Sequence, residues 1–379
     1  MKIVVAIDKF KGSATLEMIA DTVSAAIKGS SKCKVLTVRV ADGGDGTLEA
    51  VAHARKVEWH ECEVAAPVEG MPRMRAKYIS LGDRALIETA KIVGLALVPE
   101  KSRNIMRSST IAVGEAMRDA ILKGFRYVII SLGGSCTCDG GVGALSALGF
   151  EFLDGDENTL EPVAENLIHI KRVQKPRKPS VLGQNGLKAA PVEVGLLSDV
   201  CNPLLGPRGA ARIFAPQKGA SAEEVEKLEA GLQNFSRLMP EGVAERPGAG
   251  AAGGIAAGMM AFMGAEIKSG AQWMLEITRF RELISDADLV ITGEGRIDAQ
   301  TGMGKIPGEI LKVCRAAGVR CIGLCGAANF EEELPPFDAI IPVTPPHIPL
   351  DEAMKPEVTL SNISTAIKDL MINMGQSEN

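Results

Sequence analysis

Short, almost wholly apolar runs recur along the 379-residue chain, and segments with helical spacing separate many of them. Strands that are covered on both faces have this near-continuous hydrophobic character. Alternating strands and helices predict an α/β protein with a mostly parallel sheet. The apolar runs are 2–7, 34–40, 126–132, 192–198, 288–292, 320–325 and 339–343. Helical spacing is found over 108–123, 222–239 and 306–317.

One segment interrupts this alternation. Residues 60–90 contain short alternating stretches separated by the turn sequences EGMP and GD, and this pattern predicts an antiparallel meander. The chain length also favours two domains over one. We therefore expect residues 1–62 and 284–379 to form a discontinuous, Rossmann-like three-layer α/β domain. Residues 63–283 would be inserted into it as a second α/β lobe.

Charge and cysteine content exclude several classes of function. The formal net charge is −5 and no basic stripe is present, which argues against a nucleic-acid partner. The N-terminal apolar run meets a charge at Asp8, unlike the layout of a secretory signal. The eight cysteines form no C-x-x-C pair and no zinc spacing. We interpret them as small buried thiols of a cytoplasmic protein.

Residues 248–265 are uncharged and reach about the lower length limit of a membrane-spanning helix. Their many glycines and alanines give weak hydrophobicity and poor helix propensity, so we expect a glycine turn followed by a buried helix and no membrane association. The same stretch contains GAGAAG, which matches G-x-G-x-x-G. A dinucleotide site also needs a preceding strand, whereas a proline-bounded loop precedes this one. An NAD-linked dehydrogenase is therefore only an alternative.

Glycines and acids follow five of the apolar runs. In open α/β sheets, ligands bind beyond the carboxyl ends of the strands, and glycine lets backbone N–H groups approach a phosphate. Carboxylates there would repel phosphate unless they hold a metal or accept a proton. Together with nearby lysines, they indicate Mg²⁺-dependent phosphoryl transfer. The segments are DKFKGS (8–13), ADGGDGT (41–47), GGSCTCDGG (133–141), DVCNPLLGPRG (199–209) and GEGRID (293–298).

Each of these segments, taken singly, is also ordinary turn chemistry, because Asp and Gly are common after strands. The segment ADGGDGT, for example, could be a tight turn in which Thr47 caps the following helix. The occurrence of five such segments in one chain favours a functional role over chance.

In these segments the sequence resembles the type 1 glycerate kinases, also called glycerate 2-kinases, and the similarity runs nearly end to end. Lys9 stands where serine is usual in that family, and Cys136 and Cys138 stand where alanine and asparagine are usual. The stretch near 174–190 also differs from the usual sequence of the family. Lys9 and Cys138 lie close to the expected site, so these two departures bear on the expected substrate preference or efficiency. The motifs are AIDKFKGS (6–13), ADGGDGT, GGSCTCDGG, DVCNPLLG (199–206), FAPQKGA (214–220), GAGAAGG (248–254), TGEGRIDAQ (292–300) and Gly304-Lys305.

The resemblance implies ATP-dependent phosphorylation of D-glycerate to 2-phosphoglycerate, with Mg²⁺, in bacterial sugar-acid or glyoxylate metabolism. It also implies two α/β domains with the active site in the cleft between them. A kinase for another small hydroxy or sugar acid, and phosphorylation at the 3-hydroxyl, remain alternatives. A non-catalytic sensor of a sugar acid is a further alternative, which the intact acids at 199 and 298 disfavour.

For the chemistry we expect Asp199 and Asp298 to serve as hydroxyl base and as metal or water ligand, in an order that the sequence leaves open. Asp42 and Asp45 are further metal candidates, and turn-capping is the alternative role for both.

Lys11 and Lys305 are expected to neutralise γ-phosphate charge or to hold the substrate carboxylate, although Lys305 could equally be an exposed loop cation. The predicted nucleotide- and phosphate-binding residues are Gly43, Gly44, Gly46, Gly133, Gly134, Ser135, Gly293, Gly295 and Lys305. The predicted substrate-binding residues are Lys9, Arg296 and Asn202.

Overall fold

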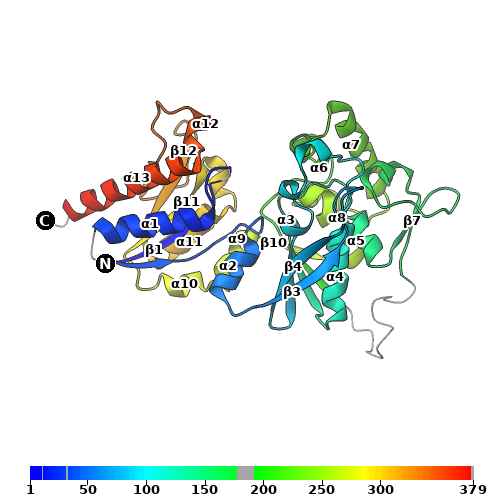
Figure 1. Cartoon of the computed structure of the whole chain (residues 1–379), viewed down its shortest axis with the longest axis horizontal. Helices are drawn as coiled ribbons and strands as arrows, with labels where there is room; N and C mark the ends of the chain where they lie inside the picture. The colour runs from blue at the N-terminus through cyan, green and yellow to red at the C-terminus, as the bar shows by residue number, and fades with distance from the viewer. Residues whose placement is uncertain (11, 31–32, 177–191, 377–379) are drawn as a thin grey trace. The chain divides into compact units, whose positions relative to one another are not determined.

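The computed structural model describes residues 1–10, 12–30, 33–176 and 192–376. Contacts within the chain divide it into two compact units. Figure 1 shows the chain coloured by residue number from the N-terminus to the C-terminus. Unit 1 consists of Met1–Asp42, Glu49–Arg55 and Ala271–Asn379. Unit 2 consists of Gly43–Leu48 and Lys56–Gly270.

Unit 1 contains a five-stranded parallel sheet with the order β13-β12-β11-β1-β2. Its centre is mainly apolar, and Ile3, Val5 and Ile291 are fully buried there. The apolar runs predicted as strands in this part of the chain are therefore confirmed. The strands are β1 (Lys2–Ile7), β2 (Lys34–Thr37), β11 (Leu289–Ile297), β12 (Arg320–Ala328) and β13 (Ala339–Pro342).

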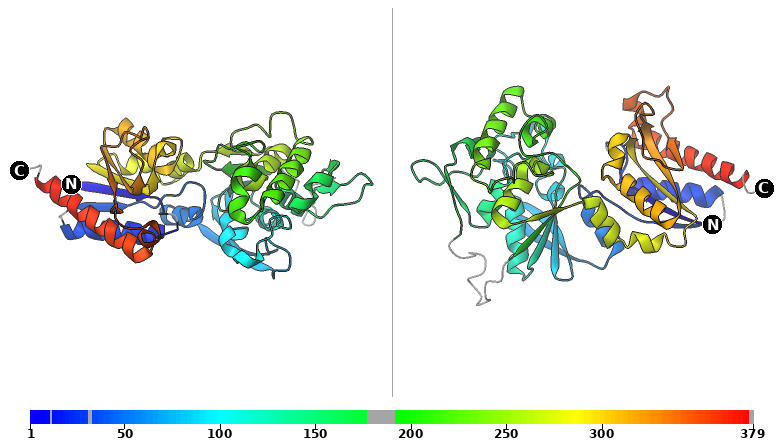
Figure 2. Two further views of the ribbon diagram at one scale, coloured as in Figure 1. Left: turned by 90° about the horizontal axis from the view of Figure 1, so that it is seen from above. Right: turned by 180° about the vertical axis from the view of Figure 1, so that it is seen from behind.

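Helices cover the sheet of unit 1. Helices α1 (Leu16–Ser30) and α13 (Pro356–Gln376) pack against each other (Figure 1). Helix α11 (Ile306–Ala317) packs on β11 and β12 from the other face (Figure 2), as right-handed crossovers in opposite directions require. It ends where Gly318 adopts a φ of 69°. Shorter helices are α2 (Thr47–Ala54), α9 (Gly270–Ile277), α10 (Phe280–Leu283), α12 (Leu350–Ala353) and the 3₁₀ helix η5 (Ala299–Gly302).

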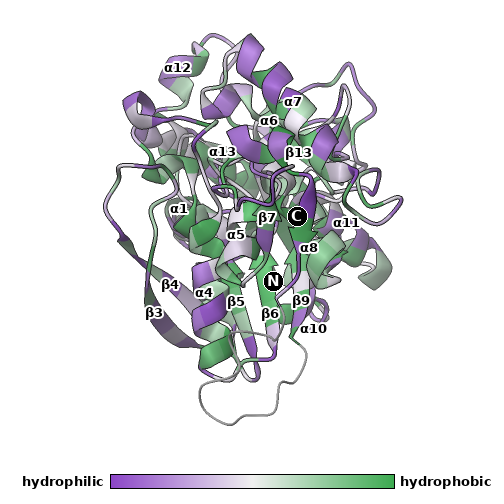
Figure 3. Cartoon of the chain, turned by 90° about the vertical axis from the view of Figure 1, so that its right-hand side faces the viewer, coloured by the Kyte–Doolittle hydropathy of each residue, from purple (hydrophilic) through white to green (hydrophobic). Residues whose placement is uncertain are grey.

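Unit 2 contains a six-stranded mixed sheet with the order β10-β9-β6-β5-β4-β3. Strands β3, β4 and β5 pair antiparallel, which confirms the predicted meander, and the remaining neighbours are parallel. The middle residues of strands β5 and β6 are hydrophobic, whereas β3 and β4 carry hydrophilic residues (Figure 3). The strands are β3 (Glu58–Val64), β4 (Met74–Leu81), β5 (Arg84–Glu88), β6 (Tyr127–Ser131), β9 (Glu193–Leu197) and β10 (Glu266–Lys268).

Helices and a small antiparallel sheet, β7 (Glu151–Leu153) with β8 (Arg172–Gln174), complete unit 2. Helix α7 begins at a capping box, in which Ser221 and Glu224 each accept a backbone N–H of the other residue. The helices are α3 (Thr89–Ile92), α4 (Ile111–Leu122), α5 (Val142–Ala147), α6 (Ala210–Phe214), α7 (Ala222–Ser236) and α8 (Ala251–Met263). Short 3₁₀ helices are η1 (Leu95–Leu97), η2 (Glu100–Ser102), η3 (Ala164–His169) and η4 (Pro216–Lys218).

The segment 248–265 forms a glycine turn and the buried helix α8, as predicted. Ala252, Gly253 and Gly254 have positive φ angles of 52°, 72° and 89°. A Cβ on Gly253 would lie 2.1 Å from the carbonyl oxygen of Thr137, so the glycine is needed for close packing. No helix in the described ranges has the length and apolar character needed to cross a bilayer.

The contact-based units differ from the predicted boundaries, 1–62 and 284–379 against 63–283. Strand β3 pairs with β4, so it belongs to unit 2 although the prediction gave most of it to the first domain. Helices α9 and α10 belong almost wholly to unit 1, whose last segment begins at Ala271. An active site shared by the two units stays a prediction.

Candidate active site

Carboxylates concentrate near the strand ends of unit 1. Asp8 directly follows β1, and its N–H donates to the Gly293 carbonyl at 2.9 Å. Burial raises the pKa of Asp8 to about 7, and the charges of Asp42 and Glu294 add to the rise. The charge of Lys9 and its N–H, which donates to Asp8 Oδ1 at 2.7 Å, oppose this rise. The region therefore holds excess negative charge, which a bound cation would offset.

Glu294, which the sequence analysis did not single out as a site residue, is the centre of a small polar cluster. Its Oε1 accepts a hydrogen bond from Thr301 Oγ1 at 2.7 Å, and Lys305 Nζ lies 3.4 Å from its Oε2. Burial raises the pKa of Glu294, and these two donors oppose the rise. Lys305 Nζ also lies 4.0 Å from Asp298 Oδ1. Lys305 is thus directed toward two carboxylates and is not an isolated loop cation.

Asp298 has a local structural role in addition to any chemical one. It caps η5, because its Oδ1 accepts the Gln300 N–H at 3.0 Å. Arg296 Nε lies 3.7 Å from the other carboxylate oxygen. The Asp298 side chain is 19% exposed and that of Arg296 is 63% exposed, so both can reach a ligand.

The segment GEGRID (293–298), whose glycines after the apolar run 288–292 predict a turn, does not turn at Gly293 or Gly295. Strand β11 continues to Ile297 and pairs in parallel with β12 as far as Ala328. A Cβ on Gly293 would lie 2.0 Å from the Leu324 carbonyl oxygen, so glycine is required there by the approach of β12. The prediction was wrong because the sequence does not show which strand lies beside this one. The turn follows later, between Asp298 and Lys305.

In unit 2 the glycine segments 43–46 and 133–135, both predicted to bind phosphate, lie close together. A Cβ on Gly133 would lie 2.7 Å from Gly44 Cα, and a Cβ on Gly43 would lie 3.3 Å from Leu197 Cβ. The segment 43–46 and the ends of β6 and β9 are therefore neighbours. The φ angle is positive at Gly43 (81°), Gly46 (93°) and Gly134 (62°). These positions favour glycine for their backbone conformation.

Glu88, at the end of β5, organises the segment 43–48. It is fully buried, and its two oxygens accept the N–H groups of Gly46 and Leu48, each at 3.0 Å. Thr47 Oγ1 donates to the Gly44 carbonyl at 2.6 Å. The Gly46 N–H, predicted to bind phosphate, is therefore engaged by Glu88, and Glu88 takes the capping role that the sequence suggested for Thr47.

Buried polar groups also hold the segment after β6. Lys218 Nζ donates to Ser135 Oγ at 3.0 Å and to the Thr137 carbonyl at 2.7 Å. Burial lowers the pKa of Lys218. The sequence analysis placed Lys218 in the FAPQKGA motif but gave it no role, because its partner Ser135 is 83 residues away.

Asp139, in the same segment, holds the local backbone in place through its hydrogen bonds. It is fully buried, and its Oδ2 accepts the Thr110 N–H at 2.8 Å and the Thr110 hydroxyl at 2.7 Å. The N–H groups of Gly141 and Gly143 each donate to it at 3.1 Å. Burial raises the pKa of Asp139, and these four donors oppose the rise.

Asp199 and Asn202 follow β9. Asp199 is half-buried, and its Oδ1 accepts a hydrogen bond from Ser269 Oγ at 2.7 Å. Asn202 Nδ2 donates to the Arg208 carbonyl at 2.7 Å, and the Asn202 carbonyl accepts the Gly250 N–H at 3.0 Å. The Asn202 amide therefore supports its own loop. Asp199 is held in one orientation by Ser269.

The remaining predicted site residues are Asp42, Asp45 and Lys11. Asp42 belongs to unit 1 and Asp45 to unit 2, and Lys91 Nζ lies 3.7 Å from Asp45 Oδ1. Lys11 lies outside the described residues. Within the described residues, no group of three or more His, Cys, Asp or Glu side chains is arranged to hold a metal ion.

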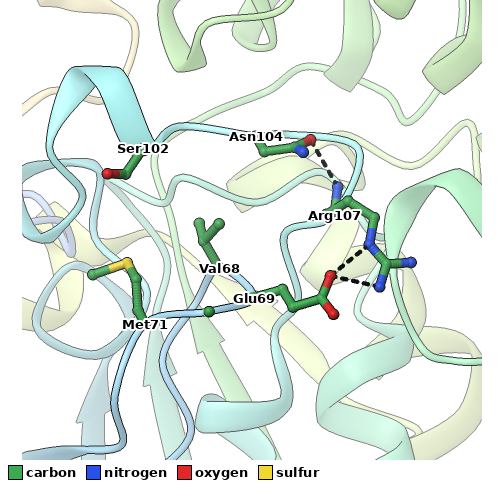
Figure 4. Close-up of a pocket in the computed structure, with 7 residues that line it drawn as sticks. Val68, Glu69, Met71, Ser102, Asn104 and Arg107 are labelled. Atoms are coloured by element: carbon green, nitrogen blue, oxygen red, sulfur yellow. Dashed lines mark hydrogen bonds and ion pairs between the residues drawn. The ribbon is translucent and has the colours of Figure 1, made fainter.

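A pocket of about 380 Å³ in unit 2 contains none of the predicted site residues. Its one cation, Arg107, is engaged by the carboxylates of Glu69, Glu161 and Glu165. Figure 4 shows the Glu69–Arg107 contact along one wall. Because this positive charge is neutralised, the pocket has little to attract a phosphate. It is lined by Val68, Glu69, Gly70, Met71, Ser102, Asn104 and Arg107.

Known proteins resemble this chain over nearly its whole length. The sequence model of the glycerate kinase family matches residues 3–373. A glycerate kinase of Halalkalibacterium halodurans is 36% identical over 366 residues, which are 93% of this chain and 93% of that protein. The glycerate 2-kinase of Escherichia coli K12 is 35% identical over 338 residues, which are 86% of this chain and 85% of that protein.

The fold has a counterpart in a crystal structure from Salmonella typhimurium LT2, assigned as glycerate kinase 2. The two structures agree with a TM-score of 0.78 at 30% identity, and the match covers 100% of this chain and 99% of the other. The predicted α/β class and the predicted kinase class are both confirmed, and a kinase family implies ATP as co-substrate. This chain belongs to the glycerate kinase family.

Proposed function

We propose that this protein transfers the γ-phosphoryl group of ATP to the 2-hydroxyl of D-glycerate, giving 2-phosphoglycerate and ADP. The observation that carries the choice of hydroxyl is the similarity to the Escherichia coli protein named glycerate 2-kinase, over 86% of this chain. The reaction would take place in the cytoplasm, since all eight cysteines are free thiols. The protein would phosphorylate an organic acid in sugar-acid or glyoxylate metabolism.

The glycine segments of unit 2 support nucleotide binding. Gly44 and Gly133 approach each other closely, and they lie where parallel strands end, which is the usual ligand-binding edge of such a sheet. We assign phosphate contacts to the backbone of 43–44 and 133–135. In unit 1, Lys305 would contact the γ-phosphate, and Gly293 would serve by letting β11 approach its neighbour. Gly295 remains a proposed phosphate contact.

Mg²⁺ fits the carboxylates of unit 1. The pKa of Asp8 is raised to about 7 by burial and by the Asp42 charge, so a divalent cation nearby would relieve an existing repulsion. Mg²⁺ commonly takes one or two carboxylates and completes its shell with phosphate and water. We assign Asp42 and Asp298 as the first candidates and Asp45, in unit 2, as a further one. Bound Mg²⁺ would neutralise charge on the transferred phosphoryl group.

Asp199 is the proposed base for the attacking hydroxyl, because the Ser269 hydroxyl fixes its orientation at 2.7 Å. Lys9 and Arg296 in unit 1 and Asn202 in unit 2 are the proposed contacts of the glycerate carboxylate and hydroxyls.

A coupled ADP-release assay with NMR analysis of the product tests this function. We expect ATP consumption with D-glycerate at millimolar Mg²⁺, a slower rate with L-glycerate, loss of activity in EDTA, and 2-phosphoglycerate as product. A 3-phosphoglycerate product would correct the hydroxyl, and a faster rate with another small hydroxy acid would correct the substrate. Absence of ADP formation with D-glycerate would refute the proposal.

A further inference from the structure

Lys218 is a buried cation without a carboxylate partner. Its side chain is at the end of η4, the residue is 4% exposed, and none of the described acidic side chains forms an ion pair with it. The nearby Asp139 directs its oxygens to Thr110, Gly141 and Gly143 instead. An ammonium group has three hydrogens to donate, whereas Ser135 Oγ and the Thr137 carbonyl take two. Burying such a charge is costly unless something pairs with it.

Two further polar atoms close to Lys218 lack partners. Thr137 is fully buried, and its Oγ1 has no hydrogen-bond partner among the described residues, nor has the buried Nε of Arg103. Arg103 lies beside Gly219, the residue that follows Lys218, because a Cβ on Gly219 would be 3.5 Å from Arg103 Cβ. The charges of Lys218 and Arg103 both oppose the burial that raises the pKa of Cys136. A buried polar atom left unpaired calls for a ligand, water or ion.

The Thr137 hydroxyl belongs to the segment that follows β6, where phosphate binding is predicted, and Lys218 contacts this segment at Ser135 and Thr137. Ser135 and Thr137 follow β6, and Gly133 in the same segment touches Gly44. Two positive charges with little neutralisation, an unpartnered hydroxyl and a glycine turn are a suitable environment for one oxyanion.

We propose that Lys218 and the Thr137 hydroxyl form an anion subsite that binds an oxyanion of the reactants, with Arg103 as a second positive charge beside it. The oxyanion is either the carboxylate of the hydroxy acid or a phosphate of the nucleotide. This identification of the reactants rests on the proposed function. Lys218 is a binding residue in this scheme, and its third N–H is the group that meets the anion.

Lys218→Met tests the charge, because methionine keeps a long unbranched side chain without the ammonium group. We expect the KM of one reactant to rise about 10- to 100-fold, the range for a hydrogen bond to a charged group, and Lys218→Arg to recover part of it. A rise confined to D-glycerate identifies a carboxylate, and a rise confined to ATP identifies a phosphate. Lys227→Met on the exposed side of α7 is the matched control and should behave like the wild type.

Thr137→Val separates binding from a structural role. Because the Thr137 hydroxyl has no hydrogen-bond partner in the part of the chain that the structure describes, its removal should leave the unfolding temperature unchanged or slightly raised. We expect the KM of the same reactant to rise about 3- to 10-fold. Unchanged KM values in both Lys218→Met and Thr137→Val would overturn the proposal. If Lys218→Met does not fold, the Thr137→Val result decides alone.

Direct binding separates this inference from the proposed reaction. If the wild type does not phosphorylate D-glycerate, the reaction is refuted, but the subsite can still be tested with inorganic phosphate. We then expect phosphate to raise the unfolding temperature of the wild type and of Lys227→Met, and to raise that of Thr137→Val less. An equal shift in all three proteins would refute the anion subsite.

Discussion

At the scale of single residues, charged side chains removed from water are stabilised in different ways. Asp139 receives four donors from within unit 2, and Glu88 receives two backbone N–H groups. Asp8 in unit 1 has the opposite environment, because the carboxylates of Asp42 and Glu294 act on it. The first two residues hold local structure together, whereas Asp8 has a charge that the fold alone does not neutralise.

This difference makes the stability of the protein depend on pH through Asp8. The folded-state pKa is about 7, above the ordinary value of 3.8. As pH rises from about 4 to 7, the unfolded chain releases this proton while the folded protein keeps it, so folding stability falls through that range. We expect Asp8→Asn to be more stable than the wild type at pH 8 in EDTA, with the advantage vanishing near pH 4.

Urea unfolding at a series of pH values measures this difference. Added Mg²⁺ should reduce the advantage of Asp8→Asn if a cation offsets the carboxylates. A stability difference that is the same at every pH would show that Asp8 does not titrate as stated.

The two acids proposed for the chemistry can be distinguished by Mg²⁺. Asparagine also caps helices, so Asp298→Asn should keep η5 and remove only the charge. Loss of a positioned base costs about 10²- to 10⁴-fold in rate, and loss of a metal ligand can cost as much but is partly recovered by more metal. We expect high Mg²⁺ to rescue part of the activity of Asp298→Asn and none of that of Asp199→Asn, in steady-state assays.

Asp83→Asn is the control for these variants, because its side chain is 92% exposed and lies in the turn between β4 and β5. It should retain the wild-type rate. The reverse rescue pattern would exchange the roles of Asp199 and Asp298. Near wild-type rates in both variants at ordinary Mg²⁺ would remove both acids from the chemistry.

At the scale of elements, the packing of β11 against β12 explains part of the TGEGRID motif, in addition to any chemical role of that motif. The sequence TGEGRID predicts a strand that opens into a turn, but the strand includes Gly293 and Gly295, and Glu294 on it contacts Thr301 and Lys305. Glycine at 293 lets β12 lie close enough to continue the ladder. Glu294 of the motif thus stands on a paired strand, whereas Asp298 follows the strand and caps η5.

Gly293→Ala tests this requirement. Its Cβ would lie 2.0 Å from the Leu324 carbonyl oxygen, and that backbone cannot move without disturbing the β11–β12 pairing. We expect a loss of about 1–3 kcal/mol or more in unfolding free energy, as for other overpacked sites, measured by urea unfolding.

Gly29→Ala supplies the comparison within unit 1. Gly29 lies in α1, and a Cβ there would meet no atom within 4 Å. Alanine should be neutral or stabilise by up to about 1 kcal/mol. If Gly293→Ala proves as stable as Gly29→Ala, β12 can move aside and the glycine has another cause.

At the scale of the whole molecule, the chain passes between the two units four times, at 42/43, 48/49, 55/56 and 270/271. The first two passages lie within ADGGDGT and just after it, so this motif contributes Asp42 to unit 1 and Gly43, Gly44 and Asp45 to unit 2. The proposed site residues are likewise divided, with Asp298 and Lys305 in unit 1 and Asp199 and Ser135 in unit 2.

The sequence by itself determined the class of fold and the family. Apolar runs indicate strands because a strand covered on both faces must be apolar along its length, and 2–7 is β1 without change of either end. The helical period over 306–317 likewise gives α11. The ordered glycine and acid motifs identified the kinase family. All these signals are local, since each reports the burial or backbone conformation of its own residues.

Only the tertiary structure decided which groups meet. Glu88 receives the N–H of Gly46 from 42 residues away, and Lys218 reaches Ser135 across 83 residues. Glycine is required at position 293 because a side chain there would overlap the backbone of β12, the strand that lies beside β11. Such partners follow from the order of strands in a sheet, which arises from long-range packing and leaves no periodic mark in the sequence. Buried polar partners therefore had to be found in the structure, although the segments that carry them could be predicted.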